Sequence, residues 1–262
     1  METNNINNLE ESKENEPYVM NLKVNEENKS CFQKLVTYLK GIPLFVGFIL
    51  ITTFILYFFT LLLPDFTLFF SNRPYRTIQK FNFWTIITSV FINSKIIVLI
   101  FTFLAWISDA IRLENCNGSI RYMFNFFINS IIIQMIYTLL SYLLSFIFFG
   151  YYFGELLEKP SHGLLPVVMA EITILSLANT EIMVTMFFIP FPFKAKFYPW
   201  AYFGFFILVG GFVVLIDIIS GIAYGYLFFY FLRRFIDFSD EFIQKVEDFL
   251  CCKYIAKLHG KF

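Results

Sequence analysis

The sequence predicts an all-α polytopic membrane protein with six transmembrane helices. Hydrophobic residues make up 58% of its 262 positions, and Phe alone occupies 38 of them. Several apolar runs carry no charge over a length that can cross the hydrocarbon core of a bilayer, which takes about 20 helical residues. The charged residues concentrate in the two tails and in the loops between these runs. This pattern is typical of helices that are surrounded by lipid.

We expect a membrane domain at residues 39–234, flanked by two tails. Residues 1–38 are acidic and Asn-rich, and they are too poor in apolar side chains to bury a core, which predicts a disordered N-terminal tail. Residues 235–262 place apolar side chains three or four positions apart, which predicts an amphipathic helix on the membrane surface or on a partner. Cys251 and Cys252 lie in this second tail, and whether they are lipidated stays open.

The six expected spans are residues 41–63, 96–113, 123–150, a segment that follows His162, 198–209 and 212–232. The fourth is the least apolar, because it contains Pro166 and Glu171. An acid that faces lipid is costly, so this span should face the interior of the bundle. We expect an aromatic first loop at the membrane interface over residues 64–94 and a second long loop over residues 179–197.

Six spans place both termini on one side of the membrane. Lys and Arg residues are frequent in both tails, which predicts that this side is the cytosol. Arg73, Arg76 and Lys80 in the first loop are the exception to this distribution.

The composition also excludes several classes of function. The net charge is zero, which argues against nucleic acid as a partner. The four Cys residues show no CxxC spacing, and Asp109, Glu171 and Asp217 are too far apart in sequence to predict a metal site, so neither a metal nor another cofactor is expected. These acids are instead expected to make polar contacts inside the membrane, with Arg112 as a candidate partner for Asp109.

Short motifs in the membrane domain resemble the rhomboid superfamily. Those that resemble its first loop and second helix are Trp84-x-x-x-Thr88-Ser89-x-Phe91 and Leu113-Glu114-x-x-x-Gly118-Ser119. Two later motifs resemble the derlins, which are inactive members of this superfamily in the endoplasmic reticulum. These motifs are Phe193-Lys-Ala195-x-x-x-Pro199-Trp200 and Asp217-Ile-Ile-x-Gly221-Ile222-x-x-Gly225. The resemblance covers residues 40–235 and implies a rhomboid-like six-transmembrane helix bundle.

The resemblance implies contacts for some of these residues. Gly221 and Gly225 lie four residues apart, so both face the same side of a helix and allow another helix to approach closely. In rhomboids this partner is the fourth helix, which here begins near Gly163. Glu114 would bond the backbone of the first loop, as rhomboid glutamates do.

The resemblance also shows what a protease would need. An active rhomboid has a Ser at the start of its fourth helix and a His three residues before the first Gly of the GxxxG motif, and the His acts as general base. Here His162 and Ile218 occupy those positions. Ile cannot accept a proton, and the side chains of Ser161 and His162 should diverge on a helix, so we expect no enzymatic activity. A protease with a rearranged site at Ser161 is the remaining catalytic alternative.

The expected function is therefore that of a derlin-like protein. Such a protein would recognise or help extract membrane clients for degradation at the endoplasmic reticulum, together with ubiquitin ligases and an ATPase. The alternative is a structural subunit of a large membrane complex, for example in the mitochondrial inner membrane. The sequence leaves the client, the compartment and the oligomeric state open.

Overall fold

The computed structural model describes residues 41–147, 153–161, 163–186, 189–211 and 214–232. The chain divides into two units, Met1–Gly41 and Ile42–Phe262, and the description below concerns the second. The expected N-terminal tail, His162, the expected C-terminal amphipathic helix and the two cysteines in that tail lie outside the described residues.

Within the described residues, four helices are long and apolar enough to cross a membrane, as expected of a helical integral membrane protein. They are α2 (Leu44–Leu62), α6 (Ile96–Asn117), α7 (Ser119–Ile147) and α11 (Leu215–Leu227), which the π-helical turn η4 (Phe228–Leu232) continues. The expected fourth and fifth spans form α9 (Leu165–Ala178) and α10 (Tyr198–Gly210), with 14 and 13 residues. These two helices are about 21 and 20 Å long, which is less than the roughly 30 Å of a hydrocarbon core.

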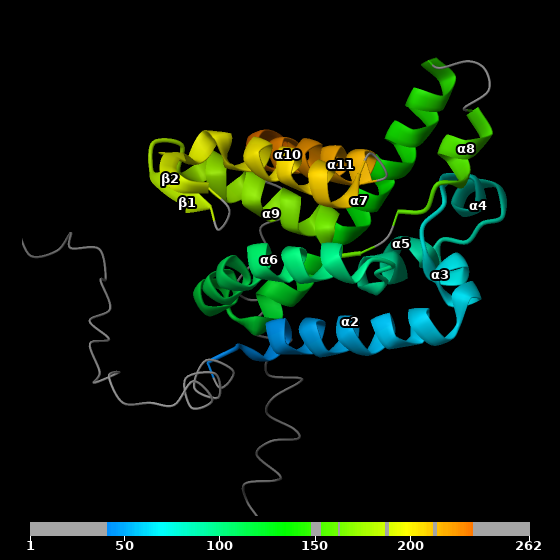
Figure 1. Ribbon diagram of the computed structural model, residues 1–262, viewed down its shortest axis with the longest axis horizontal. Coiled ribbons are helices and arrows are strands. Elements are labelled where there is room, and N and C mark those ends of the chain that lie inside the picture. Colours follow the sequence, from blue (N-terminus) through cyan, green and yellow to red (C-terminus); the bar gives the residue numbers. More distant parts are fainter. Residues whose placement is uncertain (1–40, 148–152, 162, 187–188, 212–213, 233–262) are drawn as a thin grey trace, which may run out of the picture. The chain divides into compact units, whose positions relative to one another are not determined.

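Successive long segments run in alternating directions (Figure 1). The end of α6 meets the start of α2 through Glu114 and Phe45, and the start of α6 meets the end of α10 through Lys95 and Gly210. Helix α9 lies inside this arrangement, with ten of its 14 residues buried and with contacts to α6, α7, α10 and α11. The interior position expected for the fourth segment is therefore observed.

The first loop is built from short helices. They are α3 (Pro64–Phe70), α4 (Pro74–Gln79), α5 (Trp84–Thr88) and the 3-10 turn η1 (Ser89–Phe91). Proline opens α3 and α4, because its fixed φ suits a first helical turn whose amide hydrogens have no partner. The guanidinium groups of Arg73 and Arg76 lie 3.4 and 3.7 Å from the carboxylate of Glu158, which ends α8 (Phe153–Glu158). The loop is thereby held to the segment that leads into α9.

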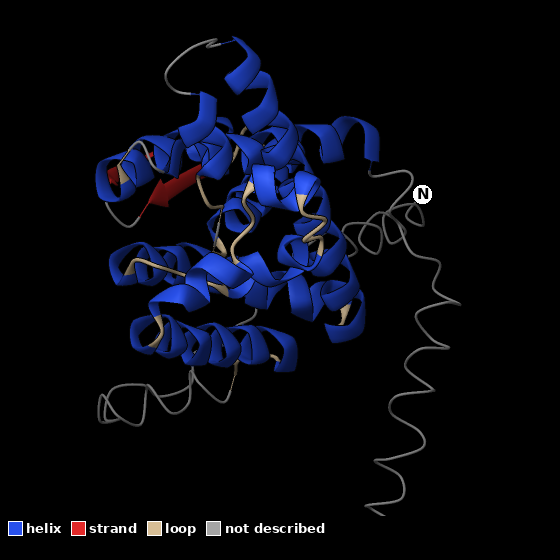
Figure 2. Cartoon of the chain, turned by 90° about the vertical axis from the view of Figure 1, so that its right-hand side faces the viewer, coloured by secondary structure: helices blue, strands red, loops and turns tan. Residues whose placement is uncertain are grey.

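The second expected long loop contains a two-stranded β-hairpin, within a fold that is otherwise mostly helical. Strands β1 (Met183–Met186) and β2 (Ile189–Lys194) pair antiparallel and lead through the 3-10 turn η2 (Ala195–Phe197) into α10 (Figure 2). Backbone groups near a membrane need hydrogen-bond partners, and strand pairing supplies them where the chain is not helical. Lys194 and Glu181 form an ion pair of 2.7 Å across the open end of the hairpin.

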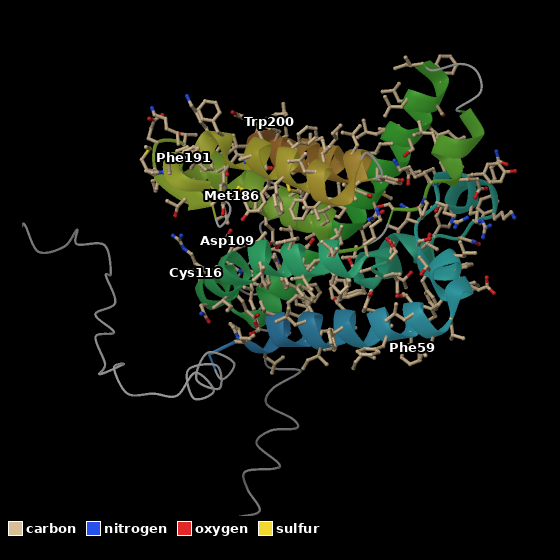
Figure 3. All side chains as sticks on the ribbon, viewed as in Figure 1. Phe59, Asp109, Cys116, Met186, Phe191 and Trp200 are labelled. Atoms are coloured by element: carbon tan, nitrogen blue, oxygen red, sulfur yellow. The ribbon has the colours of Figure 1, made fainter. Side chains whose placement is uncertain are left out.

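Apolar side chains also cover outer faces of the bundle. On α2, Phe59 is 44% exposed at the outer side of the bundle, and its ring stacks on that of Phe66 in α3 (Figure 3). Exposed Phe, Leu and Ile side chains along such a helix are expected where the surrounding medium is lipid.

Candidate functional site

Helices α9 and α11 approach each other closely at two glycines. A Cβ atom added to Gly221 would lie 2.2 Å from the backbone oxygen of Pro166. A Cβ atom added to Gly225 would lie 2.6 Å from the Cβ atom of Thr173. Both glycines therefore face α9, the partner that the resemblance implies, and their missing side chains set the distance between the helices.

A buried serine and a buried aspartate meet where these two helices begin. The Ser161 hydroxyl donates a hydrogen bond of 2.5 Å to Oδ1 of Asp217 in α11, and both side chains are buried. Ser161 lies before α9, in an extended backbone that exchanges two hydrogen bonds with Asn72 of the first loop. The expectation that Ser161 lies on a helix was wrong, because α9 begins only at Leu165.

Among the described residues, Ile218 occupies the position where an active rhomboid has its histidine base. Ile218 follows Asp217, is fully buried and has no polar atom in its side chain. Burial lowers the pKa of the nearby Lys159 ammonium group, while the negative charge of Asp217 opposes that shift. In this geometry the Ser161 hydroxyl is held by a carboxylate, and the pair links the start of α9 to the start of α11.

A small cavity of about 50 Å³ borders the Asp217 side chain, and Asn93, Ser94 and Lys95 are among its other lining residues. This volume has room for water. Asn93 also explains the glycine at position 163, which has a φ of 93° and packs against it. A Cβ atom at Gly163 would lie 2.3 Å from Oδ1 of Asn93.

A second polar cluster joins the first loop to α7. The Asn72 side-chain amide donates to Oε1 of Gln134 at 2.8 Å and to the Thr138 hydroxyl at 3.2 Å, and it accepts a hydrogen bond from Thr77. None of the sequence motifs described above predicts this cluster. Its signal is the pair Gln134 and Thr138, which are four residues apart and so share one face of α7.

Glu114 binds a different part of the chain from the one expected. Its two carboxylate oxygens accept hydrogen bonds from the backbone nitrogens of Phe45 and Val46, at 2.9 and 2.8 Å. These amides lie in the first turn of α2, where no residue earlier in the helix can accept from them. Glu114 therefore caps α2, and the expected bond to the first-loop backbone was wrong. Gly118, with a φ of 82°, ends α6 shortly after it.

Glu171 is held in the middle of the bundle. The Trp106 indole nitrogen donates to one carboxylate oxygen at 2.8 Å, and the Tyr122 hydroxyl donates to the other at 3.0 Å. Within the described residues, no group of three or more His, Cys, Asp or Glu side chains is placed to hold a metal ion. Asp109 and Arg112 do not form an ion pair, although they lie on neighbouring turns of α6; the ion pairs seen among described residues involve Arg73, Arg76 and Lys194.

The remaining motif residues lie at element ends near the surface. Trp84 begins α5, is partly exposed and contacts the ring of Phe69, with 5.9 Å between the ring centroids. Pro199 is buried in the first turn of α10, and the neighbouring Trp200 is 50% exposed (Figure 3). Tryptophan rings in such positions suit the boundary between lipid and water.

The hydrogen bond from Tyr122 to Glu171 can be tested by a nearly isosteric change. Tyr122→Phe leaves the buried carboxylate with one donor fewer, so we expect the free energy of unfolding to fall by about 2 kcal/mol. Thermal unfolding in detergent measures the loss. Tyr230→Phe removes the same atom from a side chain that is 64% exposed and serves as the control. Equal stability of the two variants would contradict a bond of this strength.

Comparison of the chain with models of known protein families finds no match. Comparison with curated proteins finds no significant match either. The function is therefore inferred from the motifs of the sequence and from the contacts among α6, α9 and α11.

Proposed function

We propose that this chain is a non-catalytic, derlin-like member of the rhomboid superfamily, with six membrane passes and both termini in the cytosol. The observation that carries the proposal is the contact of α9 with Gly221 and Gly225 of α11. The resemblance implies this pairing of the fourth expected span with the last one, through the two glycines of a GxxxG motif. A Ser–Asp hydrogen bond lies at the start of this contact, and Ile218 replaces the histidine base. The proposed role is to recognise membrane clients, or to help extract them, in endoplasmic-reticulum-associated degradation.

The lengths of α9 and α10 support a mechanism for this role. Helices of 14 and 13 residues are shorter than an ordinary hydrocarbon core, and a bilayer can adapt to short spans by becoming thinner around them. A thinner bilayer lowers the cost of moving a polar segment across it. The protein would thus ease the passage of a client without breaking a covalent bond.

Localisation and purification from mild detergent test this function. The tagged full chain is expected at the endoplasmic reticulum, where ubiquitin ligase and ATPase components co-purify with it. Loss of the chain is expected to lengthen the half-life of membrane clients in a translation-arrest chase. Mitochondrial localisation with one stoichiometric complex would contradict the proposal and favour the alternative role of a structural subunit.

A serine-reactive probe tests the non-catalytic part separately. We expect no labelling of the purified chain by a fluorophosphonate, because the Ser161 hydroxyl is buried and donates to Asp217. Labelling that is present in the original chain and lost in Ser161→Ala would show a rearranged protease site and overturn this part of the proposal.

A further inference from the structure

A polar pocket opens between the end of α6, the end of α9 and the β-hairpin. Its volume is about 360 Å³, which lies within the range of small-molecule sites. The polar side chains that line it are those of Asp109, Arg112, Ser176, Asn179, Thr185 and Tyr198. Figure 3 shows Asp109 on α6 on the side that faces the hairpin, which carries Met186 and Phe191. The pocket is separate from the Ser161–Asp217 pair, which lies at the other end of α9.

The pocket contains one negative and one positive group. The carboxylate of Asp109 is partly buried, whereas the guanidinium group of Arg112 is exposed. Residues three positions apart on a helix have Cβ atoms about 5–6 Å apart, so the two charges lie close together without forming an ion pair of their own. Each therefore remains able to bind an opposite charge on a ligand, and the ligand that satisfies both is a compact zwitterion.

The surroundings of the pocket are those of a membrane interface. Tyr198 lines it, Trp200 is exposed in the same turn of α10, and Lys194 and Lys196 are exposed where the hairpin leads into that helix. Tyrosine, tryptophan and lysine are typical of the headgroup layer. Apolar surface reaches the same opening, since Ile182 and Met183 line the pocket and are 56% and 57% exposed. A polar interior beside an exposed apolar rim matches a headgroup with its acyl chains attached.

We propose that this pocket binds the headgroup of a phospholipid that carries a primary amine, of the phosphatidylethanolamine type. The phosphate pairs with Arg112, because a guanidinium group matches the geometry of phosphate oxygens. The primary ammonium group donates hydrogen bonds to Asp109, and the acyl chains leave the pocket over Ile182 and Met183. A choline headgroup has no N–H to donate, and an anionic glycerol headgroup leaves Asp109 without a cation.

Lipid binding by the purified full chain tests the proposal, whether or not the chain acts in protein degradation. The delipidated chain in detergent is titrated with phosphatidylethanolamine, phosphatidylcholine or phosphatidylglycerol, and native mass spectrometry measures occupancy. We expect the first lipid to bind at least tenfold more tightly than the other two. Equal binding of phosphatidylcholine would overturn the role of Asp109, and equal binding of phosphatidylglycerol would overturn the zwitterionic preference.

Four variants locate the site. Asp109→Asn and Arg112→Gln are each expected to weaken binding of phosphatidylethanolamine at least tenfold. Thr185→Trp fills the pocket from an exposed position without altering either charge and should abolish binding. Glu181→Gln removes an exposed charge at the same end of the molecule and should leave binding unchanged. Thermal unfolding without lipid identifies any variant that fails to fold, and correctly folded pocket variants that bind normally would overturn the proposal.

A water-soluble competitor distinguishes a lipid from a free zwitterion. Glycerophosphoethanolamine has the same headgroup but no acyl chains, so it should displace the lipid only at a much higher concentration. Displacement at concentrations equal to that of the lipid would overturn the role of the apolar rim and of the membrane as the source of the ligand.

Discussion

Gly221→Leu is expected to prevent α9 and α11 from packing and to leave little folded protein after extraction in detergent. Even the first added carbon atom would lie 2.2 Å from the backbone oxygen of Pro166, and a backbone atom cannot turn aside as a flexible side chain can. Overpacking of a core usually costs about 1–3 kcal/mol, and a clash with backbone should lie at or above the upper end of that range. Size-exclusion chromatography and thermal unfolding in detergent measure the effect.

A glycine on α10 provides the matched control. Gly204 is exposed, and a Cβ atom at that position would have no other atom within 4 Å. Gly204→Leu adds the same side chain to a helix of similar length, so its unfolding temperature should stay close to that of the original chain. A similar fall in unfolding temperature for both variants would show that helix propensity or lipid contact, rather than the contact with α9, determines the effect of the substitution at Gly221.

Glu114→Ala is expected to have the second largest effect. Its carboxylate holds two backbone amides in the first turn of α2, and Pro43 before that turn has no side-chain acceptor. Removing it leaves two buried donors unsatisfied, which should lower the free energy of unfolding by about 3 kcal/mol or more. Glu114→Gln keeps one acceptor oxygen, so its free energy of unfolding should fall by less than that of Glu114→Ala.

Hydrogen exchange separates the two places where Glu114 could act. In Glu114→Ala the amides of Phe45 and Val46 should lose protection, whereas those of residues 64–94 should change little. Glu181→Ala, which removes an exposed acid, should leave both regions unchanged. Loss of protection confined to the first loop would contradict the capping role and restore the contact that the motif resemblance suggested.

The sequence predicted the long helices well because their ends are marked locally. The first expected span differs from α2 by three residues at its start and by one at its end, where Pro64 opens the next helix. Helix α6 begins at the expected Ile96 but continues to Asn117, four residues further than expected, and Gly118 ends it. Positions of Pro, Gly and charge are properties of the sequence itself, so such boundaries can be inferred without knowledge of the fold.

The contacts between distant segments could not be predicted in the same way. Glu114 and Phe45 are 69 positions apart, and no local pattern states which free amides a buried carboxylate will meet. The hairpin was missed because both strands are short and β2 contains two prolines, features that predict a loop. Within the candidate site, the spacing of the motif identified Gly221, Gly225 and Asp217. The hydrogen bond from Ser161 to Asp217 was not predicted, because Ser161 was expected on a helix and instead lies in an extended segment before α9.

Because α9 is buried between earlier and later helices, its contacts form in two stages while the chain is synthesised. The ribosome delivers α9 before α10 and α11, yet the surface of α9 around Pro166 and Thr173 is covered by the glycine face of α11. Until residue 225 has been synthesised, α9, which carries Glu171 in its middle, can contact α6 and α7 but not the glycine face of α11. Trp106 and Tyr122 belong to those two earlier helices, so the donors for Glu171 are already in place when it arrives. Insertion of α11 then covers α9, after Trp106 and Tyr122 from the first half of the chain have bound Glu171.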